Sequence, residues 1–131
     1  MNERFQKIFL EAHQAGMAAG NGHNPTPMVV QQHTNMLNDN SPVEQEWAVP
    51  DGVCGFAWVV LKPANNAFAK WLVANGYARK DSYYGGVRLS VSYFNQSMER
   101  KEKYARAFAA VINKYNEELK LKYAYPMSRM D

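Results

Sequence analysis

Apolar residues return at two different periods along the chain, and each period predicts its own kind of element. Near the N-terminus they recur every three or four positions, on one stripe of a helix, at Phe5, Ile8, Phe9, Ala12, Ala15 and Ala19. This pattern predicts a helix over residues 3–19. Gly20 and Gly22 are expected to end it, because glycine takes the left-handed conformation at little cost.

A period of two, with apolar residues on both faces, predicts a strand over residues 53–61. One face would hold Cys54, Phe56, Trp58 and Val60, and the other Val53, Gly55, Ala57, Val59 and Leu61. A strand that is apolar on both faces is typical of the centre of a sheet that is covered on both sides. The small residues Gly55 and Ala57 would let a helix or a ligand approach closely.

The remaining segments predict the rest of the fold. We expect a short edge strand over 28–32, a helix over 66–75, an alternating strand over 87–94 and a long helix over 95–123. Residues 34–51 are expected to form a long loop, and residues 124–131 a loose tail. Together they predict an α+β fold in a single domain, 1–131: a small, mostly antiparallel β-sheet packed by two to three helices, with a long C-terminal helix.

The composition fits one folded domain. The chain has 131 residues, of which 47% are hydrophobic, enough for one core. No apolar run approaches the roughly 20 residues that span a bilayer, and residues 1–16 lack the order of a signal peptide. We therefore expect no membrane association and a cytoplasmic location. The single cysteine excludes an intramolecular disulfide and offers no Cys-x-x-Cys metal clip.

The net charge of +3 is unevenly distributed along the chain. Residues 1–61 carry two basic and six acidic side chains, whereas residues 62–131 carry thirteen basic and six acidic ones. A basic half can attract phosphate groups or acidic proteins. The alternative is a solvated surface with a mild excess of lysine.

Cys54 and the three histidines are the first candidates for chemistry. A reactive cysteine must ionise, usually beside a histidine or at a helix N-terminus, but Cys54 shares its predicted strand face with aromatic residues. We therefore expect a buried, unreactive thiol. His13, His23 and His33 are spaced ten residues apart, which matches no helical metal clip. A site that uses two of them with Asp39 stays an alternative, but we expect no metal.

Common catalytic motifs are missing from the sequence. It contains no Gly-x-x-x-x-Gly-Lys-Ser/Thr loop, no Gly-x-Gly-x-x-Gly and no Gly-x-Ser-x-Gly. No pair of acidic residues is placed for general acid–base catalysis. The sequence therefore favours a binding protein without a cofactor over an enzyme.

A basic and tyrosine-rich cluster over residues 79–101 is the best candidate for a binding site. Arginine offers phosphate a bidentate fork, tyrosine can stack on a base, and a helix N-terminus favours anions. The cluster runs through a loop, a strand and a helix start: Arg79, Lys80, Tyr83 and Tyr84 with Gly85 and Gly86, then Arg88 with Ser90 and Ser92, then Gln96, Ser97, Arg100 and Lys101. The alternative is a tyrosine-rich turn that packs on its own sheet, with the arginines in solvent.

The two ends of this cluster are too far apart to hold one mononucleotide together. A strand of about eight residues spans roughly 25 Å, so the loop 79–84 and the helix start 95–101 would lie at its opposite ends, unless the loop folds back. We expect either that only one group binds, or that the site lies between subunits of a homo-oligomer.

The run GVCGFAWV…KPANNAFAKWL…YYGG…YFNQSMERKEKYARAFA, within residues 52–110, resembles a family of small proteins encoded by tailed phages. The resemblance implies a phage setting in the host cytosol, where small proteins often bind host or defence components, and it transfers no catalytic residues. The leading hypothesis is a non-enzymatic binding protein that sequesters a phosphate-containing small molecule, such as a nucleotide signal, against host defence. The alternatives are a nucleic-acid-associated accessory protein, and a protein–protein inhibitor or oligomeric structural protein.

Overall fold

The computed structural model describes residues 2–22, 28–33, 43–49, 54–83, 85–95 and 97–130. The elements in chain order are α1 (Asn2–Gly22), β1 (Met28–His33), β2 (Val43–Val49), β3 (Gly55–Lys62), α2 (Ala67–Ala74), β4 (Arg79–Lys80), β5 (Val87–Ser90), α3 (Met98–Lys114), α4 (Asn116–Leu119) and β6 (Tyr123–Met130). Helices combined with an antiparallel sheet confirm the predicted α+β class. Among the described residues, no helix is both long enough and apolar enough to cross a membrane.

Four strands form the main sheet in the order β4-β5-β3-β6, and each neighbouring pair is antiparallel. Its centre is β3, as the apolar pattern of that strand predicts. Trp58 of β3 pairs with Ser90 of β5 and with Met127 of β6. The chain order β3–α2–β4–β5–α3–β6, combined with this strand order, is a split β-α-β arrangement to which α1 is added.

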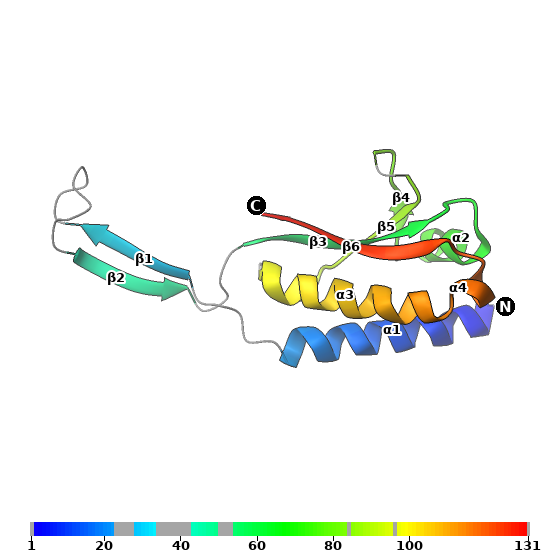
Figure 1. The fold of residues 1–131 in the computed structure, drawn as a ribbon, viewed down its shortest axis with the longest axis horizontal. Coiled ribbons are helices and arrows are strands. Elements are labelled where there is room, and N and C mark those ends of the chain that lie inside the picture. The colour runs from blue at the N-terminus through cyan, green and yellow to red at the C-terminus, as the bar shows by residue number, and fades with distance from the viewer. Residues whose placement is uncertain are drawn as a thin grey trace.

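Helices cover one face of this sheet. α3 packs against β3 and β6, and α1 packs against α3 (Figure 1). The core residues Ala57, Val59 and Leu61 alternate along β3 and face this side. A Cβ atom at Gly55 would lie only 2.6 Å from the sulfur of Met98, so the small residues of β3 admit a helix.

The opposite face of β3 is only partly covered. Trp58 and Val60 are buried, but Phe56 is 38% exposed, so the predicted coverage on both sides is wrong at this end of the strand. Arg88 covers the indole of Trp58, with its guanidinium carbon 4.1 Å from the ring centroid. A side chain from the neighbouring strand therefore takes the place of a helix there.

Glycines extend the buried stripe of α1. Gly16 and Gly20 are buried, whereas the alanines beside them are only half-buried. A Cβ atom at Gly16 would lie 2.6 Å from the ring of Tyr104, and one at Gly20 would overlap the ring of Phe94. Of the two glycines predicted to end the helix, Gly22 is its last residue, whereas Gly20 lies inside it and its missing side chain is used for close packing.

The strand predicted over 87–94 and the helix predicted over 95–123 are both shorter than expected. β5 ends at Ser90, and Phe94 and Asn95 then take positive φ angles, a conformation that residues other than glycine rarely adopt. α3 ends at Lys114, and after the short α4 the left-handed Lys120 turns the chain back to the sheet. The prediction of a long C-terminal helix is therefore wrong.

The predicted loose tail is instead the strand β6, which pairs with β3 along its length. The side-chain amide of Asn113 binds both main-chain groups of Ala124: its nitrogen donates to the carbonyl at 2.9 Å, and its oxygen accepts from the N–H at 2.8 Å. By the register, the main-chain groups of Ala124 and Pro126 point away from β3. Proline has no N–H, so the first two outward positions of β6 offer no free donor.

β1 and β2 form a separate antiparallel pair, in which Val30 lies opposite Trp47. The strand predicted over 28–32 is thus confirmed. The loop predicted over 34–51 is wrong for residues 43–49, where Val43, Trp47 and Val49 fall on alternate positions, a period-two signal that polar neighbours obscure. Residues 34–42 and 50–51 lie outside the described residues.

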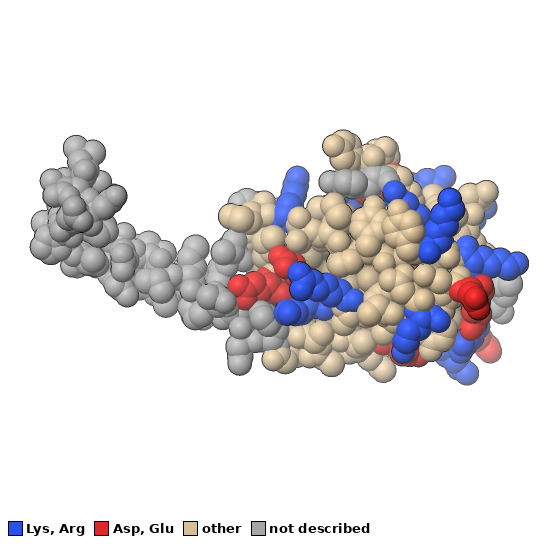
Figure 2. Space-filling model, viewed as in Figure 1, with Lys and Arg blue, Asp and Glu red and all other residues tan. Residues whose placement is uncertain are grey.

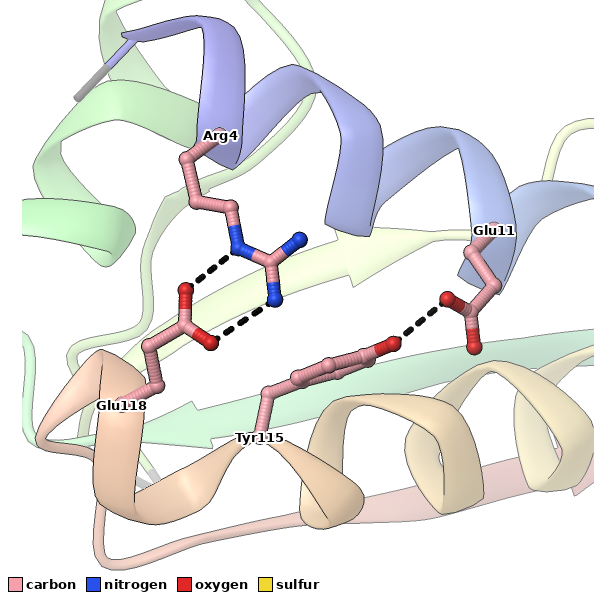
Figure 3. A network of polar contacts seen from close by, with 4 residues as sticks. All are labelled: Arg4, Glu11, Tyr115 and Glu118. Carbon is pink, nitrogen blue, oxygen red and sulfur yellow. Dashed lines mark hydrogen bonds and ion pairs between the residues drawn. The ribbon is translucent and has the colours of Figure 1, made fainter.

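Polar contacts attach α1 to the end of α3 and to α4 (Figure 3). Arg4 donates two hydrogen bonds to the carboxylate of Glu118, and the Tyr115 hydroxyl donates to Glu11 at 2.6 Å. Lys114 also donates to Glu11, at 3.0 Å. The hydrogen bond from Arg4 lowers the pKa of Glu118, and the hydrogen bonds from Tyr115 and then Lys114 lower the pKa of Glu11.

Candidate ligand-binding site

A pocket of about 420 Å³ opens where the outer edge of β5 meets α1 and the turn after α2. Its walls combine aromatic rings, cations and hydroxyl groups, from Phe9, Tyr77, Tyr93, Tyr104, Arg79, Arg88, Ser90 and Ser92. The volume falls within the range of about 300–1,000 Å³ that is usual for small-molecule sites. The pocket is therefore large enough for a compact ligand.

The edge of β5 brings main-chain polar groups to this pocket. The Val91 N–H donates to the Ala57 carbonyl at 3.0 Å, so Leu89 and Val91 direct their main-chain groups towards β3. Alternation then directs the N–H and C=O of Ser90 the other way. β4 is too short to pair with Ser90, because it reaches only Val87 and Arg88. Ser90 thus presents a main-chain donor and acceptor to the pocket beside its hydroxyl.

Aromatic rings form the wall on the helical side. The rings of Phe9 and Tyr77 are stacked, with centroids 4.3 Å apart and planes 17° apart. Tyr93 and Tyr104 continue this wall, with centroids 5.6 Å apart. Because Gly16 has no side chain, the Tyr104 ring can lie directly on α1. The wall offers flat π surfaces to a ligand ring.

Tyr104 also carries a fixed hydroxyl. Its oxygen lies 2.7 Å from Nδ1 of His13, and the two atoms share a hydrogen bond. Burial raises the pKa of Tyr104 well above its ordinary value, so the phenol stays neutral at physiological pH. A neutral phenol can donate to the imidazole, and this contact fixes the orientation of the ring that lines the pocket.

The two arginines lie side by side at the other wall. Arg79 of β4 is paired with Arg88 of β5 in the sheet register, so both side chains leave the same face. Among the described residues, neither forms an ion pair. Adjacent guanidinium groups that lack a carboxylate partner make an anion-binding arrangement.

The structure brings only part of the predicted site together. Arg79 and Arg88 line the pocket, with Ser90 and Ser92. Lys80 and Tyr83 are exposed on the β4–β5 hairpin and do not line it. Tyr84 and Gln96 lie outside the described residues.

The helix-start group has a structural role instead. Ser97 is buried and caps α3, accepting a hydrogen bond from the backbone N–H of Arg100 at 3.4 Å. Lys101 is also buried, and its ammonium donates to the Gly55 carbonyl at 3.3 Å. Neither these residues nor the Arg100 side chain lines the pocket.

Sequence reasoning missed the aromatic wall. Phe9 was expected on the apolar stripe of a helix, and Tyr93 within the alternating strand predicted over 87–94. The sequence gives no signal that α1 would meet the edge of β5, because that contact joins segments about 80 positions apart and depends on the glycines of α1.

Two expectations about chemistry can be compared with the structure. The expected burial of Cys54 is wrong, because its thiol is exposed at the start of β3. Within the described part of the chain, no group of three or more His, Cys, Asp or Glu residues could hold a metal ion. His23 and Asp39 lie outside that part.

Comparisons of the chain with protein-family models, curated proteins and solved structures give no match, so no relative contributes a residue role.

Proposed function

We propose that the pocket at the β5 edge binds a small molecule that carries both a phosphate group and a flat ring, the chemistry of a nucleotide. The observation that carries this proposal is the meeting of Arg79 and Arg88 with an aromatic wall in one pocket. The arginines suit the phosphate and the rings of Tyr77 and Tyr93 suit a base.

The edge of β5 supports the choice of a nucleotide over a simple anion. A nucleobase has hydrogen-bond donors and acceptors on its edge, and the outward N–H and C=O of Ser90 are matched to such an edge. In this proposal the protein holds its ligand without converting it. Sequestration of a nucleotide signal, as the phage resemblance implies, is the corresponding biological role.

In this proposal one chain supplies the whole site. Of the two outcomes expected for the basic cluster, only the first group binds, because Ser97 and Lys101 are engaged inside the fold. A second subunit is not needed to complete the pocket.

A ligand screen by thermal shift and calorimetry tests this function. Nucleoside mono-, di- and triphosphates and cyclic nucleotides are compared with the matching nucleosides and with inorganic phosphate. We expect at least one nucleotide to raise the Tm, since a ligand that binds only the folded state stabilises it. Its nucleoside and phosphate alone should bind more weakly.

Two pocket variants locate the site. Arg79→Gln removes a charge-assisted contact and is expected to weaken the Kd about tenfold or more, and Tyr77→Leu removes a stacking ring. Arg106→Gln, at an exposed position on α3, is the matched control and should bind as wild type does. If no nucleotide shifts the Tm, or if Arg79→Gln and Tyr77→Leu both leave the Kd unchanged, the proposed function is wrong.

A further inference from the structure

The helix-free face of the main sheet has an unusual composition. The four strands carry five lysine or arginine side chains and no aspartate or glutamate. By the register, four of these cations share the helix-free face: Lys62, Arg79, Arg88 and Arg129. Acidic side chains of the body gather instead over the helices in the view of Figure 2. The face therefore attracts polyanions.

Aromatic rings share this face with the cations. Phe56 and Trp58 of β3 and Tyr123 and Tyr125 of β6 alternate onto it. Phe56 and Tyr123, at its two ends, are 38% and 43% exposed. Tyr123 and Tyr125 stack, with centroids 5.3 Å apart. Rings that can meet a ligand thus stand at both ends of the face.

A cationic side chain lies close to an aromatic ring at each end of the face. The guanidinium of Arg129 lies 5.5 Å from the centroid of Phe56, and the ammonium of Lys62 lies 5.8 Å from that of Tyr125. A base stacked on such a ring would have its own phosphate within reach of the neighbouring cation. At the centre, the half-buried Arg88 lies over the buried Trp58, and its guanidinium completes the cationic surface between the two ends.

We propose that this face binds single-stranded nucleic acid, with bases stacked on Phe56 and Tyr123 and the phosphate backbone crossing the cations between them. Sheets with exposed aromatic side chains stack unpaired bases in this way. The seven residues from Phe56 to Lys62 span roughly 20 Å, which fits a short run of about four nucleotides. A duplex cannot stack here, because its bases are already paired and stacked.

Arg79 and Arg88 border both the nucleotide pocket and this face, but Phe56, Tyr123 and Arg129 do not line the pocket, so variants at these three residues test the proposal separately. Binding of a fluorescein-labelled oligothymidylate of about twelve nucleotides, followed by fluorescence anisotropy, tests it. A duplex of the same length and a polyglutamate competitor are the comparison ligands. We expect the single strand to bind most tightly, with an affinity that falls as salt rises, because phosphate contacts release counterions.

Ring variants test the stacking. Tyr123→Leu keeps an apolar side chain without a π face and is expected to raise the Kd about tenfold, whereas Tyr123→Phe should change it less than about twofold. Phe56→Leu makes the same test at the other end of the face and decides the matter if Tyr123→Leu does not fold. The pocket variant Tyr77→Leu should bind the oligonucleotide as wild type does.

Charge variants test the path of the backbone. Arg129→Gln should weaken binding and make its salt dependence shallower, while Arg106→Gln on α3 should do neither. Equal binding of the duplex or of polyglutamate would show a charged surface without base stacking and would overturn the proposal. So would wild-type affinity in folded Tyr123→Leu and Phe56→Leu, no binding at low salt, or loss of binding in Tyr77→Leu alone.

Discussion

Asn66 shows how much one side chain can hold in this fold. It is buried at the start of α2, where its side-chain oxygen accepts from the Ala69 N–H at 3.0 Å and caps the helix. Its side-chain nitrogen donates to the carbonyls of Leu119 and Lys120, at 2.8 and 3.0 Å. The same amide therefore caps α2 and holds the end of α4 before the chain enters β6.

Replacing Asn66 should strongly destabilise the protein. Asn66→Ala removes the cap and leaves two carbonyls without their donor, at a combined cost of about 2–4 kcal/mol. Asn66→Asp keeps the cap acceptor but directs a carboxylate at both carbonyls, so it should not restore stability. Urea denaturation measures both.

Asn75→Ala is the matched control for this prediction. Asn75 also donates to a carbonyl, that of Trp71 at 2.8 Å, but it is exposed at the end of the same helix. Its loss should cost less than about 1 kcal/mol. Equal free energies of unfolding for Asn66→Ala and Asn75→Ala would contradict the role given to Asn66.

Cys54 should react readily in the folded protein. Its thiol is exposed, although it precedes a buried strand. We expect a thiol reagent to label one equivalent before any unfolding, and Cys54→Ser to change the free energy of unfolding by less than about 0.5 kcal/mol. Labelling that requires denaturant would show a buried thiol and support the original sequence-based interpretation.

At the scale of elements, α1 is attached by both packing and charge. Its apolar stripe packs on α3, and Arg4 and Glu11 bind the segment that joins α3 to α4. Arg4 also lies over the ring of Tyr115, 5.4 Å from its centroid. This network lies at the surface, so its contribution to stability depends on the charge of two carboxylates.

Acid should weaken this attachment. The pKa values of Glu11 and Glu118 are lowered in the folded state, so the stability that they contribute is present above their ordinary pKa and is lost as pH falls through the folded values. We expect the urea concentration at the midpoint of unfolding to decrease when the pH is lowered below about 4.5. In the double variant Glu11→Gln with Glu118→Gln, that fall should be smaller. An unchanged pH profile would mean that the carboxylates contribute nothing.

The sequence predicts the elements whose signals lie within the segment itself. The helix over 66–75 is confirmed as α2, because its cap and its apolar spacing are local signals. β6 was missed, because Tyr123–Met130 becomes a strand only by pairing with β3, more than 60 positions earlier. The turn after α4 was missed too, since lysine at position 120 gives no residue-level signal for a left-handed conformation.

At the scale of the whole molecule, the candidate site combines a predictable part with an unpredictable one. Arg79 and Arg88 could be selected from the sequence, because a cluster of basic residues close together in the chain can be recognised without a structure. Their aromatic partners Phe9 and Tyr104 could not, because α1 and α3 approach the β5 edge only through tertiary packing. The helix-free face was missed for the same reason, as Tyr123, Tyr125 and Arg129 belong to the unrecognised β6.

The outer side of β6 has a consequence for how copies of this chain can associate. A sheet can grow from molecule to molecule only if each molecule has two strand edges with free main-chain N–H and C=O groups. Asn113 binds the main-chain groups of Ala124, and Pro126 has no N–H to donate. The first half of the β6 edge therefore cannot pair with another strand. The β5 edge keeps its reactive groups at Ser90. Edge-to-edge pairing at the first half of β6 is therefore blocked, and a ligand in the β5 pocket would compete with pairing at Ser90.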